Sequence, residues 1–254
     1  MTIAANVIKE KIRRKDLYII AVVSILISLL FTSSGGNLSI DGVPITEFSA
    51  LFPVMLTVVG VTGCTLAIAL SLSTIPNEYK RNTSHLIWIR GIKQSRYHSE
   101  LAIGSIISSL IGLAILYVGL VIFCVIKGEL SCIFRLPIAY VFSAIPVCIV
   151  SLCAAAVSIH LQPMVVGLIS AALLGLGFLH SPLYTLINII SNGFVSIILR
   201  WIFKCVPNLY SIQFQGAGFV TAKGSQMDFN VVLGGLLALY LLTLPVLLLK
   251  KSEA

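Results

Sequence analysis

Six long apolar runs decide what this chain can fold into. They contain no Lys, Arg, Asp or Glu, and they are Leu17–Thr32, Phe48–Ile75, Leu101–Ile126, Leu136–Ile159, Met164–Leu179 and Val231–Leu249. A helix that crosses a bilayer needs about 20 such residues. Only 10% of the 254 residues are charged, whereas a soluble domain carries about 25%. The sequence therefore predicts an all-α polytopic membrane protein with six transmembrane helices, formed by residues 1–254 as a single transmembrane domain.

The placement of basic residues predicts the topology. They lie before the first run, between the second and third runs, and after the sixth: Lys9, Lys11, Arg13, Arg14, Lys15, Lys80, Arg81, Arg90, Lys93, Arg96, Lys250 and Lys251. The connection between the first and second runs has no Lys or Arg, and the connection between the third and fourth runs has only Lys127 and Arg135. By the positive-inside rule, both termini and the segment between the second and third runs are cytoplasmic. The net charge of +8 reflects this topology rather than nucleic-acid binding, because the charges are divided among several loops.

A seventh apolar stretch, Leu183–Cys205, is interrupted by polar residues: Asn188, Ser191, Asn192, Gly193, Arg200 and Lys204. If it crossed the membrane, the basic C-terminus would lie outside. We therefore expect a re-entrant or interfacial pair of half-helices within an outer hairpin and loop over residues 181–229. Such structure is tolerated at membrane depth where protein or a cavity covers it.

Residues 1–16 are predicted to form an interfacial helix. Ala4, Ile8 and Ile12 share one face at four-residue spacing, and basic residues occupy the rest. A simple basic anchor for the first span is the alternative. Among the cysteines, Cys132 and Cys205 both fall on the predicted outer side and can pair only if their geometry allows it.

The sequence lacks the motifs of an enzyme or an ion-coupled carrier. It has no phosphate-binding Gly-x-x-x-x-Gly-Lys-Ser/Thr and no His-Glu-x-x-His. All nine acidic residues lie outside the six runs, whereas intramembrane catalysis and proton coupling generally use a buried ionisable group. We expect no catalytic, cofactor-binding or metal-binding residue in this chain, so the energy for any transport would enter from another subunit.

Small residues recur every four positions in two runs. The third run has Gly104, Ser108 and Gly112, and the fifth has Gly167, Ala171 and Gly175. Stripes of this kind let helix backbones approach closely. Packing within the chain is the favoured interpretation, and a dimer seam is the alternative.

The segment 76–100 is predicted to be a folded cytoplasmic loop. Pro76 and Asn77 are expected to break the second span, and Asn82 or Thr83 can cap a short helix that ends before Gly91. That helix would carry the apolar block Leu86-Ile87-Trp88-Ile89 between Arg81 and Arg90. A capped helix with an apolar and basic surface is typical of a docking element for a partner.

This segment resembles the cytoplasmic coupling region of ABC-2 type permeases, the membrane subunits of a large group of ATP-driven exporters. The resemblance rests on Glu78, Thr83 five residues later, the apolar block, Gly91 and Ser95-Arg96. The chain length, six spans, basic N-terminal helix and interrupted hairpin agree with that family. Many relatives have a Lys where the third span begins, whereas this chain has Glu100-Leu101-Ala102.

The resemblance implies a permease that pairs with a second copy or with a sister permease in a bacterial cytoplasmic membrane. A cytosolic nucleotide-binding ATPase subunit would hold ATP and Mg and would dock on Glu78, Thr83, Leu86, Trp88, Gly91 and Arg96. Spans one, two and five would line the cargo path and the dimer seam. The implied cargo is amphipathic or hydrophobic, with a peptide favoured; polysaccharide, drug and metal-related export stay open. A non-transporting membrane scaffold or enzyme, or a secondary transporter, is the alternative function.

Overall fold

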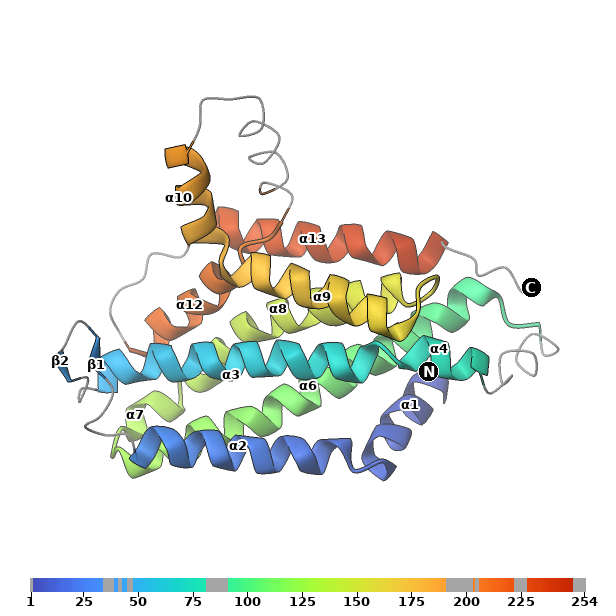
Figure 1. The fold of residues 1–254 in the computed structure, drawn as a ribbon. Coiled ribbons are helices and arrows are strands. Elements are labelled where there is room, and N and C mark those ends of the chain that lie inside the picture. The colour runs from blue at the N-terminus through green and yellow to red at the C-terminus, as the bar shows by residue number, and fades with distance from the viewer. Residues whose placement is uncertain are drawn as a thin grey trace.

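The computed structural model describes residues 2–33, 39–40, 43–44, 48–80, 91–190, 203, 206–221 and 228–248. The chain folds into a bundle of helices (Figure 1). The helices are α1 (Thr2–Arg13), α2 (Asp16–Ser33), α3 (Phe48–Ser71), α4 (Thr74–Lys80), α6 (Gln94–Ile126), α7 (Leu130–Ile133), α8 (Leu136–Val157), α9 (Pro163–Phe178), α10 (His180–Ile190), α12 (Leu209–Val220) and α13 (Phe229–Leu248). Two short antiparallel strands, β1 (Ser39–Ile40) and β2 (Val43–Pro44), precede α3.

Each of the six apolar runs forms a helix, and several of these helices can cross a membrane. Within the described residues, four are long and apolar enough: Ala50–Lys80, Gln94–Ile126, Leu136–Val157 and Phe229–Leu247. A fifth is obtained if α9 and α10, which are bent by 73° at their junction, count as one span. The apolar part of α2, Tyr18–Phe31, is shorter. The structure is thus that of a helical membrane-embedded protein with four or five candidate spans, and the sixth stays a prediction.

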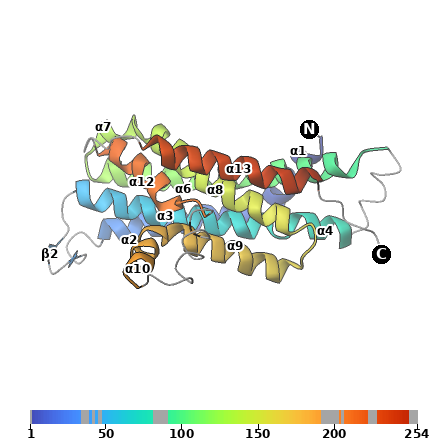
Figure 2. The ribbon, with the colours of Figure 1, turned by 90° about the horizontal axis from the view of Figure 1, so that it is seen from above.

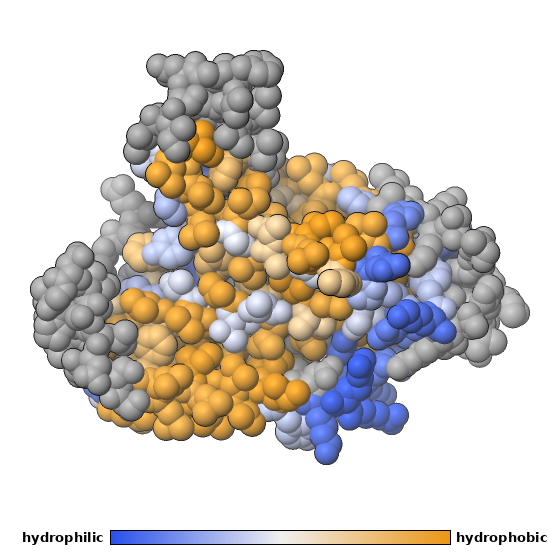
Figure 3. All heavy atoms as spheres, viewed as in Figure 1, coloured by the Kyte–Doolittle hydropathy of each residue, from blue (hydrophilic) through white to orange (hydrophobic). Residues whose placement is uncertain are grey.

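The outer surface of the bundle is apolar along its length. Large apolar side chains are exposed on α2, α9 and α13, including Leu30 (62%), Leu168 (64%) and Tyr240 (64%). Figure 3 shows this apolar surface, with hydrophilic residues gathered at one end. A surface of this kind is stable in contact with lipid and would be costly in water.

The two ends of the bundle differ in charge. We call "basic end" the end formed by α1, α4 and the first turns of α6; the C-terminal end of α13 lies there too (Figure 1). Most described Lys and Arg residues belong to these elements: Lys9, Lys11, Arg13, Arg14, Lys15, Lys80, Lys93 and Arg96. The opposite end, with β1, β2, α7 and α12, is the distal end, and its described basic residues are Lys127 and Arg135. Orientation in a membrane stays a prediction from the positive-inside rule.

Helix α6 lies at the centre of the bundle, where α1, α2, α3 and α8 all contact it. Its 33 residues extend for about 50 Å, well beyond the ~30 Å hydrocarbon core of a bilayer. The core between α3, α6 and α8 includes the fully buried Phe52, Met55 and Phe123. A hydroxyl pair, Ser71 Oγ and Ser151 Oγ at 2.7 Å, joins α3 to α8. This pair satisfies two buried hydroxyls between helices, as a low-dielectric interior favours.

The predicted break of the second span at Pro76 and Asn77 was wrong. The chain turns earlier, at Leu72 and Ser73, and α4 then continues through Pro76. Proline is tolerated in the first turn of a helix because the N–H that it lacks would have no intrahelical acceptor there. The polar loop between the second and third spans therefore begins after Lys80 rather than at residue 76.

The predicted face of the N-terminal helix was also partly wrong. Ala4 is buried, but Ile12 is 46% exposed, and the other buried side chains of α1 are Val7 and Lys11. The pattern differs because α1 packs along α6, so its inward stripe follows the contacts with that helix. Ile8 is partly exposed and lies on the neighbouring stripe with Ile12.

The region 181–229 contains a buried helix that the sequence did not predict. Helix α12 packs against α8 and α3, with Leu209, Ile212 and Ala217 buried. Asn208 caps it, since its Oδ1 accepts from the Ser211 N–H at 3.0 Å. Its 12 residues are too few to span a bilayer, so a search for long apolar runs does not find it.

Helix α10 turns away from the bundle axis (Figure 1). The 73° bend follows α9, and Figure 2 shows α9 and α10 together along one edge of the bundle. At the base of α10, His180 Nε2 lies 3.0 Å from the backbone O of Phe203, so the two ends of the interrupted stretch meet. Residues 191–202 and Cys205 lie outside the described residues, so the re-entrant hairpin stays a prediction. Cys132 is a free thiol, with its Sγ 3.8 Å from the backbone O of Val220, so the structure does not form the Cys132–Cys205 pair.

Candidate coupling site at the basic end

Hydrogen bonds join the last turn of α4 to the first turns of α6. Tyr79 OH lies 2.6 Å from His98 Nε2, and Gln94 Nε2 donates to the same phenol oxygen at 3.0 Å. Tyr97 OH donates to Glu78 Oε2 at 3.0 Å. These contacts bridge residues 15–19 positions apart. The two ends of the segment 81–90 are therefore held together at one place.

Two side chains of this base are fully buried in an apolar setting, and Glu78, Tyr79 and Gln94 are half-buried. Tyr97 and His98 have no exposed surface, and Ile75 and Leu101 pack around them. The same cluster includes Leu152 from α8 and Val246 from α13. Hydrogen bonds in such a low-dielectric environment are stronger than in water, and leaving one unmade is costly. The base is thus a firm connection between α4, α6 and the rest of the bundle.

Helix α1 packs against this base. An ideal Cβ on Gly104 of α6 would lie 2.9 Å from Val7 Cβ and 3.1 Å from the backbone O of Ala4. The absence of a side chain at Gly104 therefore lets the two backbones approach closely. On its other side, α1 forms a small cleft with α4, lined in part by Lys11, Asn77 and Glu78. Because α1 contacts both α4 and α6, a movement of either helix would change the packing of α1.

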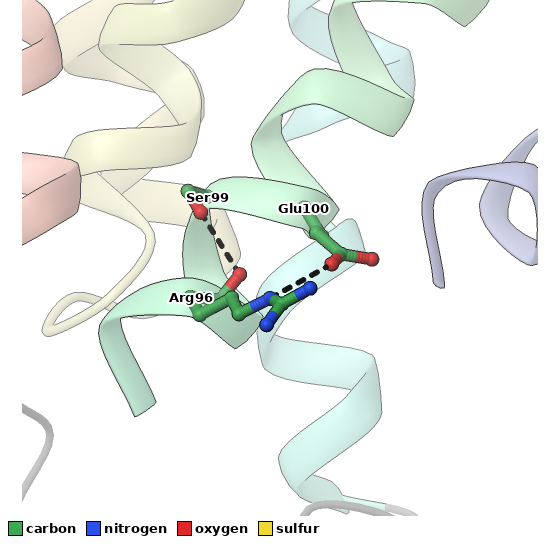
Figure 4. A network of polar contacts seen from close by, with 3 residues as sticks. All are labelled: Arg96, Ser99 and Glu100. Atoms are coloured by element: carbon green, nitrogen blue, oxygen red, sulfur yellow. Dashed lines mark hydrogen bonds and ion pairs between the residues drawn. The ribbon is translucent and has the colours of Figure 1, made fainter. Parts of the chain in front are cut away.

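Arg96 lies in the first turn of α6, with its guanidinium turned toward Glu100 (Figure 4). Its Nε lies 3.5 Å from Glu100 Oε1, one helical turn away, and its side chain is 74% exposed. Ser99 Oγ donates to the backbone O of Arg96 at 2.9 Å. Because the Arg96 side of the pair is largely open to solvent, the pair contributes at most about 1 kcal/mol. The guanidinium therefore stays near solvent, where a partner protein can reach it.

The predicted docking residues are placed differently from one another. Glu78 is half-buried and accepts the Tyr97 hydrogen bond, so it belongs to the internal base. Gly91 is exposed and has a φ of 75°, a left-handed conformation that favours glycine. Thr83, Leu86 and Trp88 lie outside the described residues.

The two predicted small-residue stripes also differ. Gly104, Ser108 and Gly112 are buried inside the chain, against α1 and α2. Gly167 and Gly175 have nothing within 4 Å of an added Cβ, and Ala171 is exposed. The first stripe thus packs the chain's own helices, whereas the second faces outward.

Sequence reasoning missed the residues that tie the base together, which are Tyr79, Gln94, Tyr97 and His98. The available signal was their position, because aromatic and hydrogen-bonding residues stand on both sides of one polar segment. What the sequence lacked was the information that the two sides meet, since the paired residues are far apart along the chain.

The described residues contain no group of three or more His, Cys, Asp or Glu arranged to hold a metal ion. The described residues of the basic end connect α4 to α6 through hydrogen bonds. No protein-family model and no curated protein sequence matches the chain, so the likeness to ABC-2 type permeases rests on the residues of this sequence alone.

Proposed function

We propose that this chain is the permease subunit of an ATP-driven exporter and that it pairs with a separate ATPase subunit. The observation that carries the proposal is the hydrogen-bonded base of α4 and α6. Helix α4 forms the end of one candidate span, Ala50–Lys80, and α6 forms another, Gln94–Ile126. Force applied to the segment between them would therefore move two spans as a unit.

In this mechanism, the ATPase subunit docks on residues 81–90 through Thr83, Leu86 and Trp88, with Gly91 at the end of the docking helix. Arg96 adds a charged contact at the surface, and Glu78 positions the base through Tyr97. ATP and Mg bind in the partner, and this chain supplies no catalytic group. Two permeases, either identical or sister subunits, shift from inward-facing to outward-facing when ATP draws their docking segments together.

The proposed cargo is an amphipathic or hydrophobic molecule, with a peptide favoured. The apolar runs hold no acidic residue that would couple transport to protons. Exposed apolar side chains on α2 and α9 suit a substrate that enters from the cytoplasmic leaflet. The size and layout of the chain resemble those of permeases that export membrane-active peptides or give immunity to peptide antibiotics.

The first test is purification of the full chain from its host in mild detergent, followed by identification of the proteins that accompany it. We expect a nucleotide-binding ATPase subunit in near-equal amount. Recovery of the folded chain without any ATPase, including after chemical cross-linking in the membrane, would overturn the proposal.

The second test separates docking from force transmission. Leu86→Ala with Trp88→Ala should reduce the amount of ATPase that co-purifies. Tyr79→Phe with Tyr97→Phe should leave the ATPase bound but uncouple its ATP hydrolysis from transport, because the base loses its hydrogen bonds. Tyr240→Phe, at an exposed position of α13, is the matched control. Full coupling in the Tyr79→Phe, Tyr97→Phe variant would contradict a role for the base.

A further inference from the structure

A second feature lies at the distal end of the bundle, away from the coupling site. A groove with a cavity volume of about 450 Å³ runs between α6, α7 and α8. Its walls include Ala114, Val118, Val121, Ile133, Leu136 and Pro137. Val118 is 57% exposed, so the groove opens on the outer surface of the bundle. The volume lies in the range of small-molecule sites, about 300–1,000 Å³.

Two tyrosines complete the groove, and their hydroxyls are engaged elsewhere. Tyr117 OH lies 2.8 Å from Ser143 Oγ, and Tyr140 OH donates to the backbone O of Leu110 at 3.0 Å. The two rings meet edge to face, with centroids 5.2 Å apart. Because both hydroxyls already have hydrogen-bond partners, the walls of the groove offer mainly apolar contacts to a bound molecule. A hydrocarbon chain fits this chemistry, whereas a peptide backbone would lose its hydrogen bonds there.

A basic residue stands at the rim of the groove. Arg135 stands between the lining residues Ile133 and Leu136 and is exposed. The structure gives Arg135 no ion pair within the described residues, although the exposed Glu129 lies in the same turn region and offsets part of its charge.

The apolar residue beside Arg135 indicates how this rim meets a membrane. Phe134 is 86% exposed, and Leu130 of α7 is 59% exposed. Exposed apolar rings next to basic side chains are typical of the level of the lipid head groups, where the rings enter the bilayer and the cations stay at its surface. The groove therefore runs from the head-group level into the hydrocarbon.

We propose that this groove binds one acyl chain of an anionic membrane phospholipid, with the phosphate-containing head group on Arg135. The hydrocarbon wall selects the chain, and the basic rim selects the charge of the head group. The site is distinct from the coupling site, because its lining residues belong to the opposite end of α6 and to α7 and α8.

The test uses the full chain, purified in detergent and stripped of lipid. Equal trace amounts of phosphatidylglycerol and phosphatidylcholine with identical acyl chains are added, and native mass spectrometry counts the lipids that stay bound. We expect one phosphatidylglycerol to be retained in preference to phosphatidylcholine. Arg135→Gln should lower that preference by about fivefold, since a basic residue near an anionic surface contributes about that factor. Lys93→Gln, an exposed residue of the basic end, should leave the preference unchanged.

Groove-filling variants test the position of the acyl chain. Ala114→Phe and Val121→Phe should each reduce the retention of both lipids at least tenfold, whereas Val141→Phe, at an exposed position of α8 outside the groove, should not. Unchanged thermal unfolding temperatures would show that the variants still fold. Equal retention of the two lipids by the unsubstituted chain, or full retention by both groove-filling variants, would overturn the proposal. Neither result would concern the ATPase subunit, so the proposed function is tested separately, by co-purification.

Discussion

Helices α6 and α9 carry small residues at the same four-residue spacing, but their surroundings differ. On α6, an added Cβ at Gly104 would meet Val7 at 2.9 Å, and one at Gly112 would meet Ile20 Cδ1 at 3.0 Å. On α9, Gly167 and Gly175 have nothing within 4 Å. The spacing of small residues thus shows that a close approach is possible, but it does not identify the helix that approaches.

The difference follows from position in the bundle. Helix α6 lies at the centre and is contacted on several sides, so its small residues are filled by neighbours. Helix α9 lies along one edge (Figure 2), and its buried residues are Val166, Ser170 and Gly177. In the resemblance to ABC-2 type permeases, the fifth span belongs to the dimer seam, and an outward-facing stripe on α9 is compatible with that proposal.

The largest effect is expected at the contact between α2 and α6. An added Cβ at Gly119 would lie 2.5 Å from the Oγ atoms of Ser24 and Ser28 and 3.0 Å from the backbone O of Ser24. Gly119→Val should therefore destabilise the protein by about 1–3 kcal/mol, the usual cost of overpacking. Thermal unfolding in detergent would measure this. Gly167→Val is the matched control on α9, and an equal loss in both variants would contradict the comparison.

A smaller effect is expected where α12 meets α3. Gln213 Nε2 donates to the backbone O of Leu56, and the amide lies where a Cβ on Gly60 would stand. Gly60→Ala should displace this buried amide and cost about 1–2 kcal/mol, because its hydrogen bond is lost in an apolar interior.

A double-mutant cycle tests this assignment. In a Gln213→Ala background, Gly60→Ala should cost much less, and the difference between the two costs is the coupling energy. Gly175→Ala on the open face of α9 should be close to neutral. Additive costs for Gly60→Ala and Gln213→Ala would show that the two sites are independent.

Removing one hydrogen bond between helices should have a still smaller effect. Ser24 Oγ donates to the backbone O of Ile115 at 3.1 Å, from α2 to α6. Ser24→Ala should cost about 0.6 kcal/mol, the average for such bonds in membrane proteins. Thr243→Ala, which removes a bond from Thr243 Oγ1 to Tyr240 O within α13, should cost less. The midpoint of unfolding in a denaturing detergent compares the two, and the opposite order would contradict the interhelical role of Ser24.

The smallest effect on stability is expected on the open face of α9. Gly167→Leu should change the free energy of unfolding by less than about 0.5 kcal/mol, as at a site without close neighbours. If α9 forms a dimer seam, the same variant should lower the fraction of cross-linked pairs formed through Ala171→Cys. A large loss of stability would show that this face is packed within the chain, and unchanged cross-linking would place the seam elsewhere.

Much of the secondary structure could be predicted from the sequence, because each span is a local apolar run. The six runs became helices with small shifts at their ends. Helix α12 could not be found this way, because it is short and carries the polar Gln213 and Gln215 among its buried residues. Its burial depends on α3 and α8, which the local sequence does not reveal.

The candidate coupling site could be predicted only in part. The polar segment and its position between two spans followed from composition and charge. The contacts of Tyr79 with His98 and of Tyr97 with Glu78 could not, since each pair is separated by 19 positions. The placement of Pro76 inside α4 was missed because a proline marks either a break or the first turn of a helix.

The sequence by itself determined that this protein is helical and suited to a membrane. In lipid, a long uncharged run can satisfy its backbone hydrogen bonds within one segment only as a helix. It also determined that the basic residues divide between the ends unequally. The tertiary structure decided that α1 and α2 fill the small-residue stripe of α6 whereas the stripe of α9 stays open. It also decided which residues hold the base of α4 and α6, and where a groove opens. These features depend on residues far apart in the chain that meet only when the helices pack.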